Sequence, residues 1–142
     1  MPFWLLFTSI ITLIIGYSYY DSFRHNSYLK KISSKRGYIS KEEFINYFTI
    51  IGFEEKWIEK LYNHILIYVP SKGFTISPQD NIIEDYRIVD EDFEDLVFTL
   101  YRERNGVEIT QKEIDVHSQF VKNPGSIESI LALISKKYEK AH

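Results

Sequence analysis

The segment that decides the fold is Arg87-Ile88-Val89-Asp90-Glu91-Asp92-Phe93-Glu94-Asp95-Leu96-Val97. Its acidic run suits the positive pole of a helix, and apolar residues then recur at helical spacing as far as Tyr101. Asn105-Gly106 supplies a stop, and Arg102 and Arg104 lie at the negative pole. The pattern predicts a helix from about Asp90 to Arg104, and we expect Asp90 to cap it by accepting backbone N–H bonds.

Four more helices are predicted around this segment. Ser40 and Thr110 each open a capping box, and Ser126 is expected to cap a last helix whose apolar face reaches Tyr138. An amphipathic pattern runs from about residue 54 to residue 69. Residues 74–86 form a long connection, which we expect to be pinned by Phe74, Ile76, Ile82 and Ile83. The pattern as a whole predicts an all-α fold.

The amino-terminal part of the chain is apolar. Residues 3–20 hold 18 positions without a charge, close to the ~20 that a helix needs to cross a hydrocarbon layer about 30 Å thick. Trp4 lies near one end and tyrosines near the other, as at the two interfaces of a bilayer. Because no basic residue precedes the run and no small-x-small cleavage site follows Ile15, we expect an uncleaved transmembrane anchor rather than a signal peptide.

The charges divide the rest of the chain. Residues 21–36 carry five basic side chains and one acidic side chain, and residues 37–142 carry 12 basic and 19 acidic side chains. We therefore expect a transmembrane anchor over 1–20, a basic juxtamembrane linker over 21–36 and a helical domain over 37–142. Basic residues after the anchor place the carboxyl-terminal domain in the cytoplasm. The acidic domain disfavours nucleic acid as a partner, because phosphates would be repelled.

Residues for catalysis or metal binding are not grouped in the sequence. The chain has no cysteine, its four histidines include no i, i+4 pair, and no serine lies in a Gly-x-Ser-x-Gly setting. The acidic run is not a calcium loop, because Asp95 replaces the glycine required at the sixth position. We therefore expect no catalytic residue, no cofactor and no metal, and a protein that is not an enzyme.

Three short segments resemble the acyl carrier protein family: Asp92 with Asp95-Leu96-Val97, then Gly106-Val107-Glu108-Ile109 and Ile127-Glu128-Ser129-Ile130. The resemblance covers about residues 54–139 and is greatest to small bacterial acyl-carrier-like proteins of unknown function. It implies an acyl-carrier-like four-helix bundle, here preceded by a short helix and the transmembrane helix. In carriers a serine at the start of the recognition helix holds the phosphopantetheine arm, and Asp90 stands at that position. An aspartate does not accept that group, so the resemblance implies a docking face without a cargo.

The sequence therefore predicts a non-catalytic protein-interaction domain at a bacterial inner membrane, crossing it once. It would bind a basic protein surface through an acidic patch made of Asp80, Glu84, Asp85, Asp90, Glu91, Asp92, Glu94 and Asp95. Two alternatives remain open: an immunity protein that neutralises a toxin, and an atypical acyl carrier modified on another serine.

Overall fold

The computed structural model describes residues 3–69 and 73–136, which form six helices and no strand. The helices are α1 (Phe3–Ser34), α2 (Lys41–Ile51), α3 (Glu55–Tyr68), α4 (Asp90–Asn105), α5 (Gln111–Phe120) and α6 (Ile127–Ser135). The predicted all-α class is confirmed. The last helix ends at Ser135, and Tyr138, which was expected on its apolar face, lies outside the described residues.

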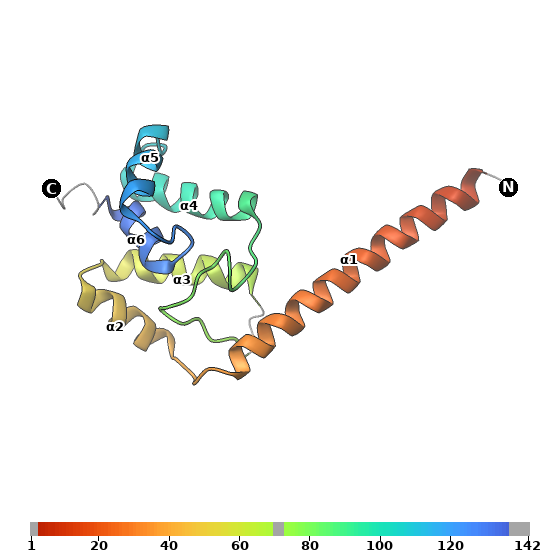
Figure 1. Ribbon diagram of the computed structural model, residues 1–142, viewed down its shortest axis with the longest axis horizontal. Coiled ribbons are helices and arrows are strands. Elements are labelled where there is room, and N and C mark those ends of the chain that lie inside the picture. The colour runs from red at the N-terminus through yellow and green to blue at the C-terminus, as the bar shows by residue number, and fades with distance from the viewer. Residues whose placement is uncertain (1–2, 70–72, 137–142) are drawn as a thin grey trace.

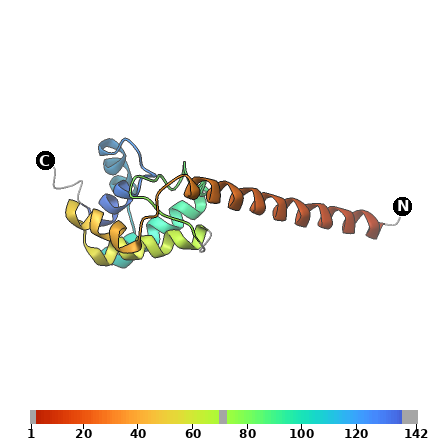
Figure 2. The same cartoon turned by 90° about the horizontal axis from the view of Figure 1, so that it is seen from below.

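Helices α2–α6 form one body, and α1 projects from it as a long arm (Figure 1). Within the body α2 packs on α3, and α4 packs on both α3 and α6. A view turned by 90° shows the same separation between arm and body (Figure 2). Helix α6 contacts α3 as well, so α3 packs against α2, which precedes it, and against α4 and α6, which follow the long connection.

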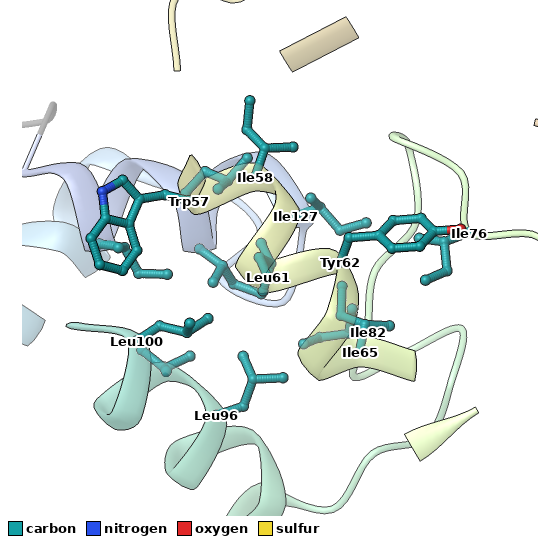
Figure 3. Close-up of a cluster of buried hydrophobic side chains, with 14 of the residues drawn as sticks. Trp57, Ile58, Leu61, Tyr62, Ile65, Ile76, Ile82, Leu96, Leu100 and Ile127 are labelled. Carbon is teal, nitrogen blue, oxygen red and sulfur yellow. The ribbon is translucent and has the colours of Figure 1, made fainter. Parts of the chain in front are cut away.

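The core lies between α3, α4, α6 and the connection. Leu61 and Ile65 of α3 face Leu96 and Leu100 of α4, and Ile127 of α6 closes the group (Figure 3). All five side chains are 0–2% exposed. Burying one such side chain stabilises the fold by about 1.5–3 kcal/mol, so this cluster holds the three helices together.

Short-range signals set most helix ends. Ser40 and Thr110 form the two predicted capping boxes, and Ser126 accepts the cap hydrogen bond of α6. The expectation for Asp90 was wrong, because Val89 is the N-cap of α4 and no side chain caps this helix. Val89 holds the extended conformation (φ −69°, ψ 153°) that an N-cap adopts, so Asp90 is already the first helical residue.

The connection between α3 and α4 is pinned as predicted. Phe74, Ile76 and Ile82 are buried and Ile83 is partly buried. The backbone also contacts the segment before α6, since Ile82 N donates to the carbonyl of Gly125 over 2.9 Å. A Cβ atom on Gly125 would lie 2.3 Å from the Asn81 side-chain oxygen, so this approach requires glycine.

A buried carboxylate joins α1 to this connection. Asp80 is 3% exposed, and it accepts hydrogen bonds from the Ser77 backbone N–H (2.8 Å), the Tyr86 hydroxyl and the Arg36 guanidinium. Burial first, and then the charge of Asp80, raise the pKa of Tyr86, so its hydroxyl stays a donor. A buried charge needs such compensation, because desolvation of an unpaired ion costs several kcal/mol.

The carboxyl-terminal end of α1 contacts the body at two further points. Leu29 is fully buried. The Ser33 hydroxyl donates to the carbonyl of Gly73 (3.1 Å) and accepts from the backbone N–H of Thr75 (3.0 Å). The region expected as a linker therefore continues the amino-terminal helix and fixes the direction in which it leaves the body.

The predicted transmembrane helix is not supported. None of the helices within residues 3–69 and 73–136 is long and apolar enough to cross a membrane.

The Asp80 cluster gives a stability prediction. Asp80→Asn removes the buried charge and leaves the Arg36 guanidinium without its carboxylate, so we expect the free energy of unfolding to fall by about 3 kcal/mol. Urea denaturation followed by circular dichroism measures this loss. The matched variant Glu84→Gln neutralises an exposed neighbour and should change stability by less than about 0.5 kcal/mol. Equal unfolding midpoints for the two variants would contradict the assigned role of Asp80.

Candidate partner-docking site

Six of the eight predicted acidic residues lie on the surface. These are Glu84, Asp90, Glu91, Asp92, Glu94 and Asp95, and we call them the acidic patch. None of the six forms an ion pair with a basic residue of the described chain. Five of them lie in the first two turns of α4, on the side of the body from which α1 projects (Figures 1 and 2).

The other two residues serve the fold. Asp80 is buried in the cluster with Arg36 and Tyr86, so it is not available to a partner. Asp85 is partly buried and accepts a hydrogen bond from the backbone N–H of Asn81 (2.7 Å). All eight residues were predicted to form one patch because all are acidic. Their burial in the structure divides them into six surface residues and two residues that stabilise the fold.

A hollow of about 300 Å³ adjoins the acidic patch between α4, α5 and α6. Its apolar lining includes Phe93, Val97 and Ile130, and Phe98 at its edge is 41% exposed. Asp90 and Glu94 line the same hollow, so carboxylates lie beside apolar side chains there. The arrangement suits a ligand that combines an apolar group with a positive charge.

His117 of α5 also lines this hollow and is 5% exposed. Burial lowers its pKa, which keeps the imidazole neutral near pH 7. Asp90 and Glu94 are the carboxylates that share the hollow with it. No sequence pattern singles out this histidine, since its burial depends on how α5 packs.

A second polar cluster holds α5 in place. Glu113, which completes the capping box with Thr110, also accepts from the Tyr101 hydroxyl of α4 and from the Lys136 ammonium (2.8 Å). Burial alone would raise the pKa of Glu113, but hydrogen bonds from Lys136, Tyr101 and Thr110 outweigh it and hold this pKa at about 2. Glu113 is therefore ionised at neutral pH and ties α4, α5 and the end of α6 together.

Within the described ranges, no group of three or more histidine, cysteine, aspartate or glutamate side chains is placed to hold a metal ion. His64 is partly buried on α3, with its Nδ1 atom 2.9 Å from the carbonyl of Lys60.

Comparison with known proteins identifies no relative, since no family model, no curated protein and no solved structure matches this chain.

His117 gives a prediction for the dependence of stability on pH. The pKa of His117 in the folded protein is lower than its value of about 6.5 in the unfolded chain. At a pH below about 6.5 the unfolded state therefore binds more protons at this residue than the folded state does. The free energy of unfolding should therefore fall as the pH drops below about 6.5, by at most about 1.4 kcal/mol per unit from this group. In His117→Gln the difference in stability between pH 7 and pH 5.5 should shrink, by at most about 1.3 kcal/mol. An unchanged difference would exclude His117 as its source.

Proposed function

We propose that this chain is a non-catalytic protein-interaction domain that attaches to a lipid bilayer and docks a basic partner at the start of α4. The observation that carries the proposal is the position of an apolar hollow directly beside the acidic patch, whose carboxylates have no ion pair in the described chain. The partner segment would place an apolar side chain in the hollow and lysine or arginine against Asp90 and Glu94.

The electrostatics of α4 favour this use of its start. The positive pole of the helix stabilises the first carboxylates, which allows several acids to be held close together. A basic partner would relieve their mutual repulsion and would be drawn to the patch over about a Debye length. The binding would therefore depend on salt mainly through its association rate.

The order of α3, a long pinned connection, α4, the short α5 and α6 supports an acyl-carrier-like arrangement. In this proposal Asp90 replaces the modified serine, and the docking face is retained without a prosthetic group. The proposal extends to the short helix α2, which covers α3 through Phe44 and Phe48, with the rings of Phe44 and Tyr62 5.0 Å apart.

Attachment to the bilayer would come from the amino-terminal half of α1. Residues 4–23 hold thirteen of the 21 exposed large apolar or aromatic side chains in the described chain, among them Leu13 at 72% and Ile14 at 63%. Such a surface is unfavourable in water, and transfer of each side chain to an apolar environment gains about 1.5–3 kcal/mol. The basic residues that follow would place the domain at the cytoplasmic leaflet of a bacterial inner membrane, where anionic lipids attract them.

The docking proposal is tested by charge reversal in the acidic patch. We expect Glu91→Lys, Asp92→Lys and Asp95→Lys together to lower the association rate of the partner at least about tenfold at low salt, because attraction becomes repulsion. The partner is first captured on the immobilised protein from membranes in mild detergent and identified by mass spectrometry. Its binding to the variant is then followed by surface plasmon resonance at two salt concentrations.

The matched control is Glu42→Lys, Glu55→Lys and Glu128→Lys. These residues are also exposed and lie in the first turns of α2, α3 and α6, so the control changes net charge equally and costs similar helix-dipole energy. It should retain partner binding. If both triple variants bind as the unchanged protein does, the acidic patch is not the docking surface.

The attachment proposal is tested by flotation with lipid vesicles. We expect Ile10→Ser, Leu13→Ser and Ile14→Ser together to lower the partition coefficient at least about a thousandfold, because three apolar side chains no longer enter the lipid. The control Ile50→Ser, Ile51→Ser and Ile67→Ser changes three exposed isoleucines of the body and should float like the unchanged protein. Recovery of the unchanged protein in the vesicle-free fraction would reject attachment.

A further inference from the structure

A polar hollow of about 400 Å³ lies where α1 meets the body. Asp21, Arg24, His25 and Tyr28 line it from α1, and Arg87 lines it from the connection before α4. Arg87 is at least 59 positions away in sequence from each of the four α1 residues. Only folding therefore brings the two sides of the hollow together. The hollow is distinct from the one beside the acidic patch, whose lining comes from α4, α5, α6 and the segments beside them.

Arg87 is held in place at a conformational cost. Its φ angle is 54°, in the left-handed region that residues other than glycine rarely adopt. Its neighbours Tyr86 and Ile88 are buried at 0% and 6% exposure, which fixes the backbone on both sides. The guanidinium carbon then lies 4.0 Å from the centre of the Tyr28 ring, so the exposed arginine is stacked over α1.

The charge of the hollow is positive. Arg24 and Arg87 each bring a guanidinium, Asp21 brings one carboxylate, and His25 is also present. Among the described residues neither arginine forms an ion pair, unlike Arg36, which is taken up by Asp80. Two guanidinium groups on one hollow suit a phosphate, which arginine binds through paired N–H donors.

The hollow follows directly after the apolar segment of α1. Arg24 lies four positions after Tyr20, a rise of about 6 Å along a helix. The tyrosines at 17, 19 and 20 are suited to the interface of a bilayer, and the phosphates of lipids lie just beyond that level. If the apolar segment enters lipid, Arg24 and Arg87 therefore lie at the depth of the headgroups.

We propose that this hollow binds the phosphate of an anionic glycerophospholipid, with Arg24 and Arg87 as its two ligands. The proposal rests on the attachment to lipid proposed above, and it adds which lipid the protein selects. A choline headgroup would bring its ammonium group toward the two arginines and be disfavoured, whereas the hydroxyls of a glycerol headgroup can donate to Asp21. A free phosphate ion offers the same chemistry but has no link to the lipid-facing segment.

Vesicle flotation with charge-preserving variants tests the site. The full chain is floated on vesicles of phosphatidylcholine alone and of equal parts phosphatidylcholine and phosphatidylglycerol. For Arg24→Lys with Arg87→Lys we expect about tenfold weaker binding to the vesicles with phosphatidylglycerol, because paired N–H contacts are lost at constant charge. Binding to phosphatidylcholine alone should be unchanged. Lys30→Arg with Lys31→Arg, exposed on the same helix, should bind both vesicles like the unchanged protein.

The outcomes separate this site from the attachment itself. Wild-type binding of the Arg24→Lys, Arg87→Lys variant to both vesicles would overturn the headgroup site and leave attachment intact. Failure of the unchanged protein to float on either vesicle would overturn both. In a competition experiment, inorganic phosphate is compared with chloride at equal ionic strength. If phosphate removes the preference for phosphatidylglycerol and chloride does not, the hollow binds a free anion. Because Arg24 is exposed on the arm, Arg24→Lys alone repeats the test without disturbing the body.

Discussion

The structure depends on the compensation of one buried charge, the carboxylate of Asp80. This carboxylate accepts hydrogen bonds from Arg36, two residues after α1, from the Tyr86 hydroxyl and from the Ser77 backbone N–H. The described part of the connection between α3 and α4, residues 73–89, thereby becomes a fixed part of the core, although it contains no helix or strand. The start of α4, the acidic patch and the position of Arg87 all follow from where this connection ends.

The two proposed binding regions are placed by this same connection. The amino-terminal part of the connection contacts Ser33 of α1. At its carboxyl-terminal end Arg87 contacts the Tyr28 ring of α1, and Asp90, at the start of α4, lines the hollow beside the acidic patch. The basic and acidic surfaces are therefore near one another on the side of the body that faces the arm (Figure 1). A partner at the patch would be held close to the lipid surface.

Local sequence signals were sufficient to predict most helix ends. They were not sufficient for residues whose role depends on burial in the folded protein. Ser40, Thr110 and Gly106 act within four residues of their own position, so capping and stop signals were sufficient for them. Asp80 and Arg36 are 44 residues apart, and no local pattern distinguishes a buried aspartate from the exposed acids that follow it. The same holds for His117 and for Arg87, whose surroundings are created by packing. The transmembrane helix was predicted from a count of uncharged residues, and no helix of the described residues is long and apolar enough to cross a membrane.

The continuity of α1 through Ser34 has a consequence for geometry. A helix advances about 100° for each residue, so the contacts of Leu29, Ser33 and Arg36 set which face of residues 3–20 points in each direction. One residue inserted between Tyr20 and Tyr28 would move the body only about 1.5 Å along the axis but would turn it by about 100°. In the proposed attachment, the rotational phase of the helix, more than its length, would therefore determine which surface of the body faces the lipid.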